Sequence, residues 1–112
     1  MPNELPLETD CQTVHTKLTR DDRFLLIDCR EPEEFEQAQI AGAKLIPMSQ
    51  LAARVDELSS FRDWEIAVHC HHGGRSMRVT NWLREQGFPK TQSMAGGIDR
   101  WSLEIDPTIP RY

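Results

Sequence analysis

The stretch that decides the fold is Glu65-Ile66-Ala67-Val68-His69-Cys70-His71-His72-Gly73-Gly74-Arg75-Ser76. Its apolar start, residues 66–68, is typical of a strand buried on both faces in a parallel sheet. Gly73 and Gly74 favour a tight loop whose backbone can approach a ligand closely. Residues 77–88 follow with apolar side chains at helical spacing and with Gly87 near the end. The pattern therefore predicts a strand, a loop and a helix, in that order.

Cys70 lies in this pattern where the strand ends and a loop of amide N–H groups begins. Such N–H groups, together with the N-terminus of the next helix, stabilise an anion, and a thiolate is an anion. Arg75 adds a permanent positive charge whose planar guanidinium can bind an oxyanion. We therefore predict that Cys70 ionises near neutral pH and acts as a nucleophile, with Arg75 as the second catalytic residue.

The other residues of the loop are candidates for binding the substrate. His71, His72, Gly73 and Gly74 would line the site and offer their backbone N–H groups to an anion. Ser76 would add a hydroxyl group or cap the following helix. The two histidines are more simply polar loop lining than catalytic bases, because an ionised thiol has no proton to abstract.

The rest of the chain alternates strands and helices. Apolar runs predict strands at 24–29, 44–47 and 90–94. Amphipathic spacing predicts helices at 7–18, 49–58 and 98–103, and a short helix begins near Glu31, with Thr9 and Ser49 as N-caps of the first two. This alternation predicts one α/β domain over residues 1–112, with parallel strands and right-handed crossovers. Residues 1–7 are expected to form a loose lead-in and residues 104–112 a C-terminal tail.

Asp28 and Arg30 stand near the carboxyl end of the predicted strand 24–29, where open α/β sheets bind their ligands. They are either a structural polar pair or part of the substrate pocket. Cys29, between them, is either a core residue or a second thiol close enough to take part in the chemistry.

Composition and charge narrow the class of protein. The net charge of -5 over 112 residues argues against nucleic acid or an anionic membrane as the main partner. The chain has neither a long apolar run nor a basic and apolar leader at its start, so we expect neither a membrane span nor export. Three cysteines without a C-x-x-C motif favour reduced thiols in a cytoplasmic protein. We expect no cofactor. We also expect no metal, because the adjacent residues 69–72 cannot all converge on one ion.

Residues 70–76 resemble the active-site loop of the single-domain rhodaneses, a sulfurtransferase superfamily. Further stretches in the same order as in that family are Leu26-Ile27-Asp28-Cys29-Arg30, Glu33-Glu34-Phe35, Ile40-Ala41-Gly42-Ala43, Ile46-Pro47 and Ala95-Gly96-Gly97 with Trp101. The resemblance covers residues 8–103. It implies a three-layer rhodanese-like fold, with about five parallel strands and helices on both faces of the sheet.

The resemblance also implies an activity, in which Cys70 carries a persulfide. The sulfur would come from thiosulfate or a persulfide donor and pass to a thiol, cyanide or protein acceptor. Gln39 stands where many relatives have histidine, so a supporting hydrogen bond is in question. Phosphatases and arsenate reductases with a related loop have one residue more between cysteine and arginine, and we rank them below sulfur transfer.

Alternative interpretations remain open at this point. The chain could be a non-catalytic module of the same fold that binds proteins or senses redox state through Cys70. Cys70 could be an inert buried thiol. Arg75 could serve only as the ion-pair partner of an acidic neighbour such as Asp28 or Glu34.

Overall fold

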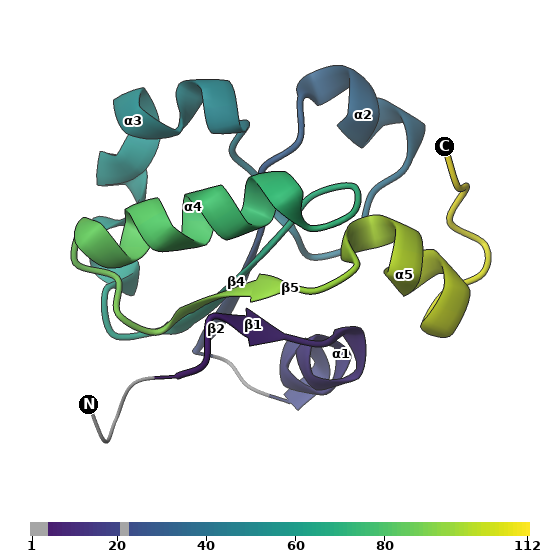
Figure 1. Ribbon diagram of the computed structural model, residues 1–112, viewed down its shortest axis with the longest axis horizontal. Helices are drawn as coiled ribbons and strands as arrows, with labels where there is room; N and C mark the ends of the chain where they lie inside the picture. The colour runs from purple at the N-terminus through teal and green to yellow at the C-terminus, as the bar shows by residue number, and fades with distance from the viewer. Residues whose placement is uncertain (1–4, 21–22) are drawn as a thin grey trace.

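The structure, a computed structural model, describes residues 5–20 and 23–112. Its centre is a parallel sheet of five strands in the order β1-β5-β4-β2-β3 (Figure 1). The strands are Glu8–Thr9 (β1), Phe24–Asp28 (β2), Lys44–Leu45 (β3), Glu65–His69 (β4) and Thr91–Met94 (β5). The helices are Cys11–Arg20 (α1), Pro32–Gln37 (α2), Leu51–Arg54 (α3), Gly74–Glu85 (α4) and Gly97–Glu104 (α5), with 3-10 helices at Met48–Gln50 (η1) and Val55–Phe61 (η2).

Helices cover both faces of the sheet, and each face has its own core. On one face, Ile27, Val68 and Cys70 pack against side chains from α3, η2 and α4. On the other face, Leu26 and Ala67 pack against α1 and α5. Adjacent residues of a strand point to opposite faces, so the continuous apolar runs of β2 and β4 supply both cores. The predicted α/β fold with a central parallel sheet is confirmed.

The first strand is the largest difference from the sequence-based expectation. The predicted helix 7–18 instead begins at Cys11, and Glu8 and Thr9 pair with Ser93 and Met94 at the sheet edge. The N-cap is Asp10 rather than Thr9, because the Asp10 carboxylate accepts a hydrogen bond from the Thr13 N–H at 2.7 Å. A strand of two residues has no periodicity of its own and is fixed by its partner strand.

The segment after β3 also differs from the expectation. Residues 48–61 form η1, α3 and η2 in succession rather than one helix from Ser49 to Leu58. Ser49 does not cap a helix, and its hydroxyl group donates to the Glu31 carboxylate at 3.0 Å. The segment still packs Leu51 and Leu58 into the core, so the predicted apolar face holds although the helix is broken.

All five strands run the same way, so their carboxyl ends meet at one edge of the sheet. The loop before α4, the start of α5 and the C-terminal segment lie together at that edge (Figure 1). Within the described residues, no helix is long and apolar enough to cross a membrane. Open α/β sheets bind their ligands at the carboxyl edge, so we expect a functional site there.

Candidate active site

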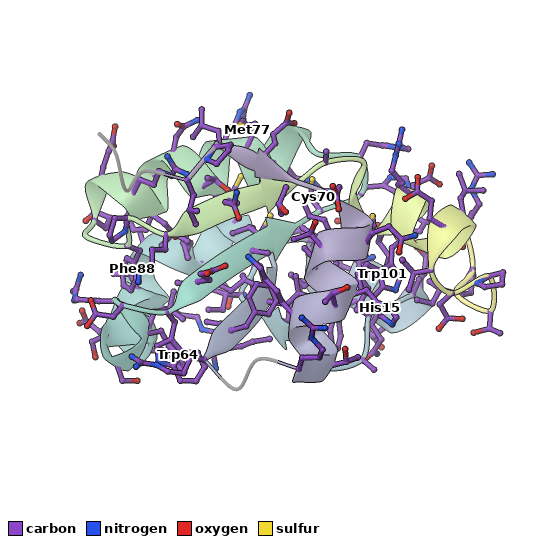
Figure 2. All side chains as sticks on the ribbon, turned by 90° about the horizontal axis from the view of Figure 1, so that it is seen from below. His15, Trp64, Cys70, Met77, Phe88 and Trp101 are labelled. Atoms are coloured by element: carbon purple, nitrogen blue, oxygen red, sulfur yellow. The ribbon has the colours of Figure 1, made fainter. Side chains whose placement is uncertain are left out.

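Cys70 directly follows β4 at the carboxyl edge, and only 1% of it is exposed to solvent (Figure 2). Its position is fixed on two sides. Its backbone carbonyl accepts a hydrogen bond from the Ile98 N–H at 2.9 Å, which ties it to α5. The next residues turn sharply into α4, which begins at Gly74.

The loop aims hydrogen-bond donors at the sulfur atom of Cys70. The Gly73 N–H donates to Cys70 Sγ at 3.1 Å, and the Ser76 N–H donates to it at 3.3 Å. The Ser76 hydroxyl oxygen lies 3.5 Å from Sγ and 2.7 Å from the Ser93 hydroxyl on β5. Backbone N–H groups that converge in this way form an anion nest at the N-terminus of a helix.

These donors make Cys70 an acidic thiol. The largest influence on its pKa is the adjacent thiol of Cys29, which favours the Cys70 thiolate. Burial opposes it, but the hydroxyl and N–H of Ser76 and the N–H of Gly73 add to the first effect, and the pKa of Cys70 falls to about 4. At neutral pH the group is therefore a buried thiolate, and the thiolate is the reactive form of cysteine.

Two glycines let the backbone take this shape. Gly73 has a φ of +122°, which a residue with a side chain rarely adopts, and this conformation turns its N–H toward the sulfur. Gly97, at the start of α5, has a φ of +59°. A Cβ atom there would lie 2.4 Å from the carbonyl oxygen of His71, so α5 packs on the loop backbone only because residue 97 is glycine.

Arg75 does not point a free guanidinium at Cys70. Its two Nη atoms donate to the two carboxylate oxygens of Glu34 on α2 at 2.6 and 2.9 Å. This bidentate contact is the main cause of the low pKa of Glu34, about 2, and it raises the pKa of Arg75. The ion pair with Glu34, one of the alternatives raised by the sequence, is therefore present and ties the loop to α2.

Asp28 and Arg30 are fully buried beside the site. Arg30 donates two side-chain hydrogen bonds to the Asp28 carboxylate, at 2.9 and 2.6 Å. It also donates to the backbone carbonyls of Glu34 and Ala38, at 3.2 and 2.6 Å. These contacts bind the end of β2 to the middle and to the C-terminal end of α2 and so position Glu34.

His71 is half-buried in the loop, and His72 is exposed. The His71 ring stacks on Tyr112 with centroids 3.9 Å apart and ring planes within 4°. His72 is mostly exposed, and its Nδ1 lies 3.9 Å from an Asp99 carboxylate oxygen. Gly74 is exposed at the start of α4 and has open space where a Cβ atom would be.

Tyr112 brings the C-terminal segment into the site. Its hydroxyl group accepts a hydrogen bond from Arg30 at 2.9 Å and donates to Glu34 at 2.8 Å. Neighbouring Arg111 pairs with Asp99 at 2.9 Å. No sequence signal marked Tyr112, because it lies in a segment with two prolines and no periodic pattern. Gln39 contacts its own segment, since its amide group donates to the Phe35 carbonyl at 3.3 Å.

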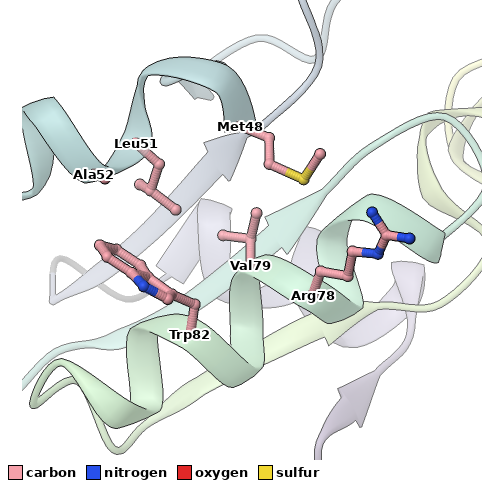
Figure 3. A pocket seen from close by; sticks show the side chains of 6 residues that line it. All are labelled: Met48, Leu51, Ala52, Arg78, Val79 and Trp82. Atoms are coloured by element: carbon pink, nitrogen blue, oxygen red, sulfur yellow. The ribbon is translucent and has the colours of Figure 1, made fainter.

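A cavity of about 290 Å³ lies on the α4 side of the sheet, between α3 and α4 (Figure 3). Its lining is apolar except for one arginine, and consists of Met48, Leu51, Ala52, Arg78, Val79 and Trp82. Met48 connects it with the site, because its N–H donates to the Cys29 carbonyl at 2.9 Å. Over residues 5–20 and 23–112, no three His, Cys, Asp or Glu side chains are placed to hold a metal ion.

Comparison with known proteins gives the family. The model of the rhodanese-like domain matches residues 11–104. A rhodanese-like/PpiC domain-containing protein 12 of Arabidopsis thaliana is 40% identical over 107 residues, which cover 90% of this chain and 36% of that protein. A sulfurtransferase of Allochromatium vinosum is 30% identical, with 91% of this chain and 94% of the relative covered. The chain thus spans about a third of the Arabidopsis relative and nearly all of the bacterial one.

The solved structures agree with this match. A rhodanese-related protein from Thermoplasma volcanium has a TM-score of 0.80 and 27% identity, and the alignment covers 96% of this chain and 100% of that one. The chain belongs to the rhodanese-like family. The resemblance on which the sequence analysis relied is therefore confirmed.

Proposed function

We propose that this protein is a rhodanese-type sulfurtransferase that moves a sulfane sulfur from thiosulfate or a persulfide donor to a thiophilic acceptor, by way of a persulfide on Cys70. The observation that carries the proposal is the convergence of the Gly73 and Ser76 N–H groups on a buried Cys70 sulfur. Membership of a family in which relatives of similar length are named sulfurtransferases supports the general class.

In the first step, the Cys70 thiolate attacks the outer sulfur of the donor. With thiosulfate, a new S–S bond forms to Cys70, the S–S bond of thiosulfate breaks, and sulfite leaves with the electron pair. In the second step, an acceptor nucleophile such as cyanide, a thiol or a protein thiolate attacks the outer sulfur. Cys70 leaves as a thiolate, and its low pKa makes it a good leaving group.

The surrounding residues take different roles in this proposal. The N–H groups of Gly73 and Ser76 hold the negative charge on Cys70 before and after the transfer. His71, His72 and Gly74 line the approach. Arg75 holds the loop through Glu34, and the oxyanion of a donor would compete with Glu34 for the same guanidinium.

Asp28 and Arg30 maintain the frame that places Glu34. The three thiols are unpaired, and we place the activity in the cytoplasm, where thiols stay reduced.

Intact mass spectrometry after incubation with thiosulfate tests the proposal. We expect the wild-type protein to gain one sulfur atom that cyanide removes, and Cys70→Ala to gain none. Cys11→Ala is the matched control, because it removes a buried cysteine that belongs to the core on the other face of the sheet and should still gain sulfur. If neither thiosulfate nor a low-molecular-weight persulfide adds sulfur to the wild type, the enzyme proposal is wrong and a protein-binding or redox-sensing role takes its place.

A further inference from the structure

Cys29 and Cys70 occupy equivalent positions on neighbouring strands. Asp28 of β2 pairs with His69 of β4, and each cysteine is the next residue in its strand. The Cys29 N–H donates to the His69 carbonyl at 3.0 Å, which continues the pairing past the end of β2. Neighbouring strands lie about 4.8 Å apart, so side chains at matched positions touch when they share a face.

The two cysteines do share a face. Asp28 and His69 point to the opposite side of the sheet, where His69 Nε2 lies 3.7 Å from the Asp28 carboxylate. Because side chains alternate along a strand, Cys29 and Cys70 both point toward α3 and α4, and they belong to the same packed cluster. Cys29 is 0% exposed and Cys70 is 1% exposed, so no water competes for this contact.

A hydrogen-bond donor on a neighbouring strand would reach Cys70 Sγ from a different side than the loop donors do. The donors of Gly73 and Ser76 come from the loop that follows Cys70 in the chain. Cys29 approaches from the neighbouring strand, and its thiol carries one proton. An apolar side chain of similar size would fill the same space but would leave the thiolate without this donor.

We propose that Cys29 is a positioning residue of the sulfur-transfer site, whose thiol stays protonated and donates a hydrogen bond to the sulfur of Cys70 from the sheet side. The pKa shifts of the two groups agree with this division, since each thiol is the largest influence on the other and the pKa of Cys29 is raised while that of Cys70 is lowered. The inference rests on the proposed function, because only that function makes this a sulfur-transfer site. Its test, however, needs no sulfur donor.

The test measures the rate at which iodoacetamide alkylates Cys70 as a function of pH, with the modified residue located by mass spectrometry. Cys29→Val removes the donor and keeps an apolar side chain at this position. We expect it to raise the apparent pKa of Cys70 by about one unit or more, which slows alkylation about tenfold at pH values below the wild-type pKa. Cys29→Ser keeps a donor and should retain the wild-type profile. Cys11→Ala, the matched control, should also leave it unchanged.

Two outcomes would overturn the proposal. One is a wild-type profile in Cys29→Val, and the other is an equal shift in Cys29→Val and Cys29→Ser, which would indicate packing rather than hydrogen bonding. A wild type that gains no sulfur from thiosulfate yet shows the predicted shift in Cys29→Val would refute the enzyme proposal and leave this one standing.

A second measurement avoids substitution at residue 29, in case its variants do not fold. In Cys11→Ala at neutral pH, with Cys70 ionised, the Raman S–H stretch comes from Cys29. We expect a band at lower frequency than that of an unbonded thiol, which moves to higher frequency when Cys70 is alkylated. A band that does not move on alkylation contradicts the hydrogen bond.

Discussion

Cys11 and Cys70 are both buried cysteines, yet their surroundings drive them in opposite directions. Cys11 is 0% exposed beneath α5, and its thiol faces the carbonyl oxygen of Gly97 at 4.0 Å. Burial is the main cause that raises its pKa to about 11. Cys70 is 1% exposed, but it faces hydrogen-bond donors, and its pKa falls to about 4. The comparison shows that the reactivity of a buried thiol depends on whether its neighbours donate or accept hydrogen bonds.

The backbone makes this difference with one short segment. Gly97 faces Cys11 with its carbonyl oxygen, and it packs closely on the backbone of Cys70 and His71. Gly97 thus contacts both cysteines, the thiol of Cys11 through its carbonyl oxygen and the backbone of Cys70 through close packing. A fold can thus keep one buried thiol inert and another reactive.

The largest expected effect is the pattern of alkylation at low pH. Only the thiolate reacts, so at about pH 6 the fraction of reactive Cys70 should exceed that of Cys11 by several orders of magnitude. We expect iodoacetamide to modify one residue of the wild-type protein, Cys70, and to leave Cys70→Ala unmodified over the same time. Peptide mapping checks this result. Comparable labelling of Cys11 would contradict the difference in reactivity between the two thiols.

The next effect concerns the loop glycine that orients a donor. Gly73→Ala forces a side chain onto a φ of +122°, which we expect to lower the free energy of unfolding by about 1–3 kcal/mol and to raise the pKa of Cys70. Gly74→Ala is the matched control, because a Cβ atom there meets nothing within 4 Å and lies at the start of a helix. Urea denaturation and the pH dependence of alkylation measure both variants. Equal behaviour of the two would show that the loop tolerates a different path.

The third effect concerns the ion pair that anchors the loop. Glu34→Gln loses the charge that binds Arg75, and we expect it to lower the free energy of unfolding by about 1–3 kcal/mol at neutral pH. Because the pKa of Glu34 is lowered from 4.5 to about 2, its stabilisation is complete above pH 4.5 and is lost as pH falls toward 2. The difference in unfolding free energy between wild type and Glu34→Gln should therefore become smaller as the pH falls through that range. Thermal unfolding measured from pH 7 to pH 3 would show this.

Glu57→Gln is the control for this variant, because it breaks an exposed ion pair with Arg54 and should change stability much less. A pH-independent gap for Glu34→Gln would mean that shape rather than charge holds the loop.

Much of the fold could be predicted because its signals are local. The run 66–68, the two glycines and the helical spacing after them lie within one stretch, and the structure has a strand, a loop and a helix there. The strand β1 could not be predicted in this way. It consists of two residues without periodicity, and the amphipathic pattern of α1 extends back over them. Its pairing with β5 depends on residues at the other end of the chain.

The same distinction applies to the candidate site. The N–H groups of residues 73 and 76 follow from the loop sequence, and the structure aims them at Cys70. The contact with Cys29 depends on β2 lying next to β4, which the spacing along the chain does not reveal. Tyr112 reaches the loop from the C-terminal segment, and its stacking on His71 is a product of tertiary packing alone.

The edge pairing of β1 with β5 has a consequence for the order of folding. Ser93 of β5 connects this edge pairing with the site. Its N–H donates to the Leu7 carbonyl, and its hydroxyl group contacts Ser76 beside Cys70. Residues 7 and 93 are 86 positions apart in a chain of 112 residues, and such non-local contacts form slowly. During refolding, helical structure should therefore return before the acidic thiolate does. We therefore expect the alkylation rate of Cys70 during refolding to report the assembly of the strands and the loop around its sulfur.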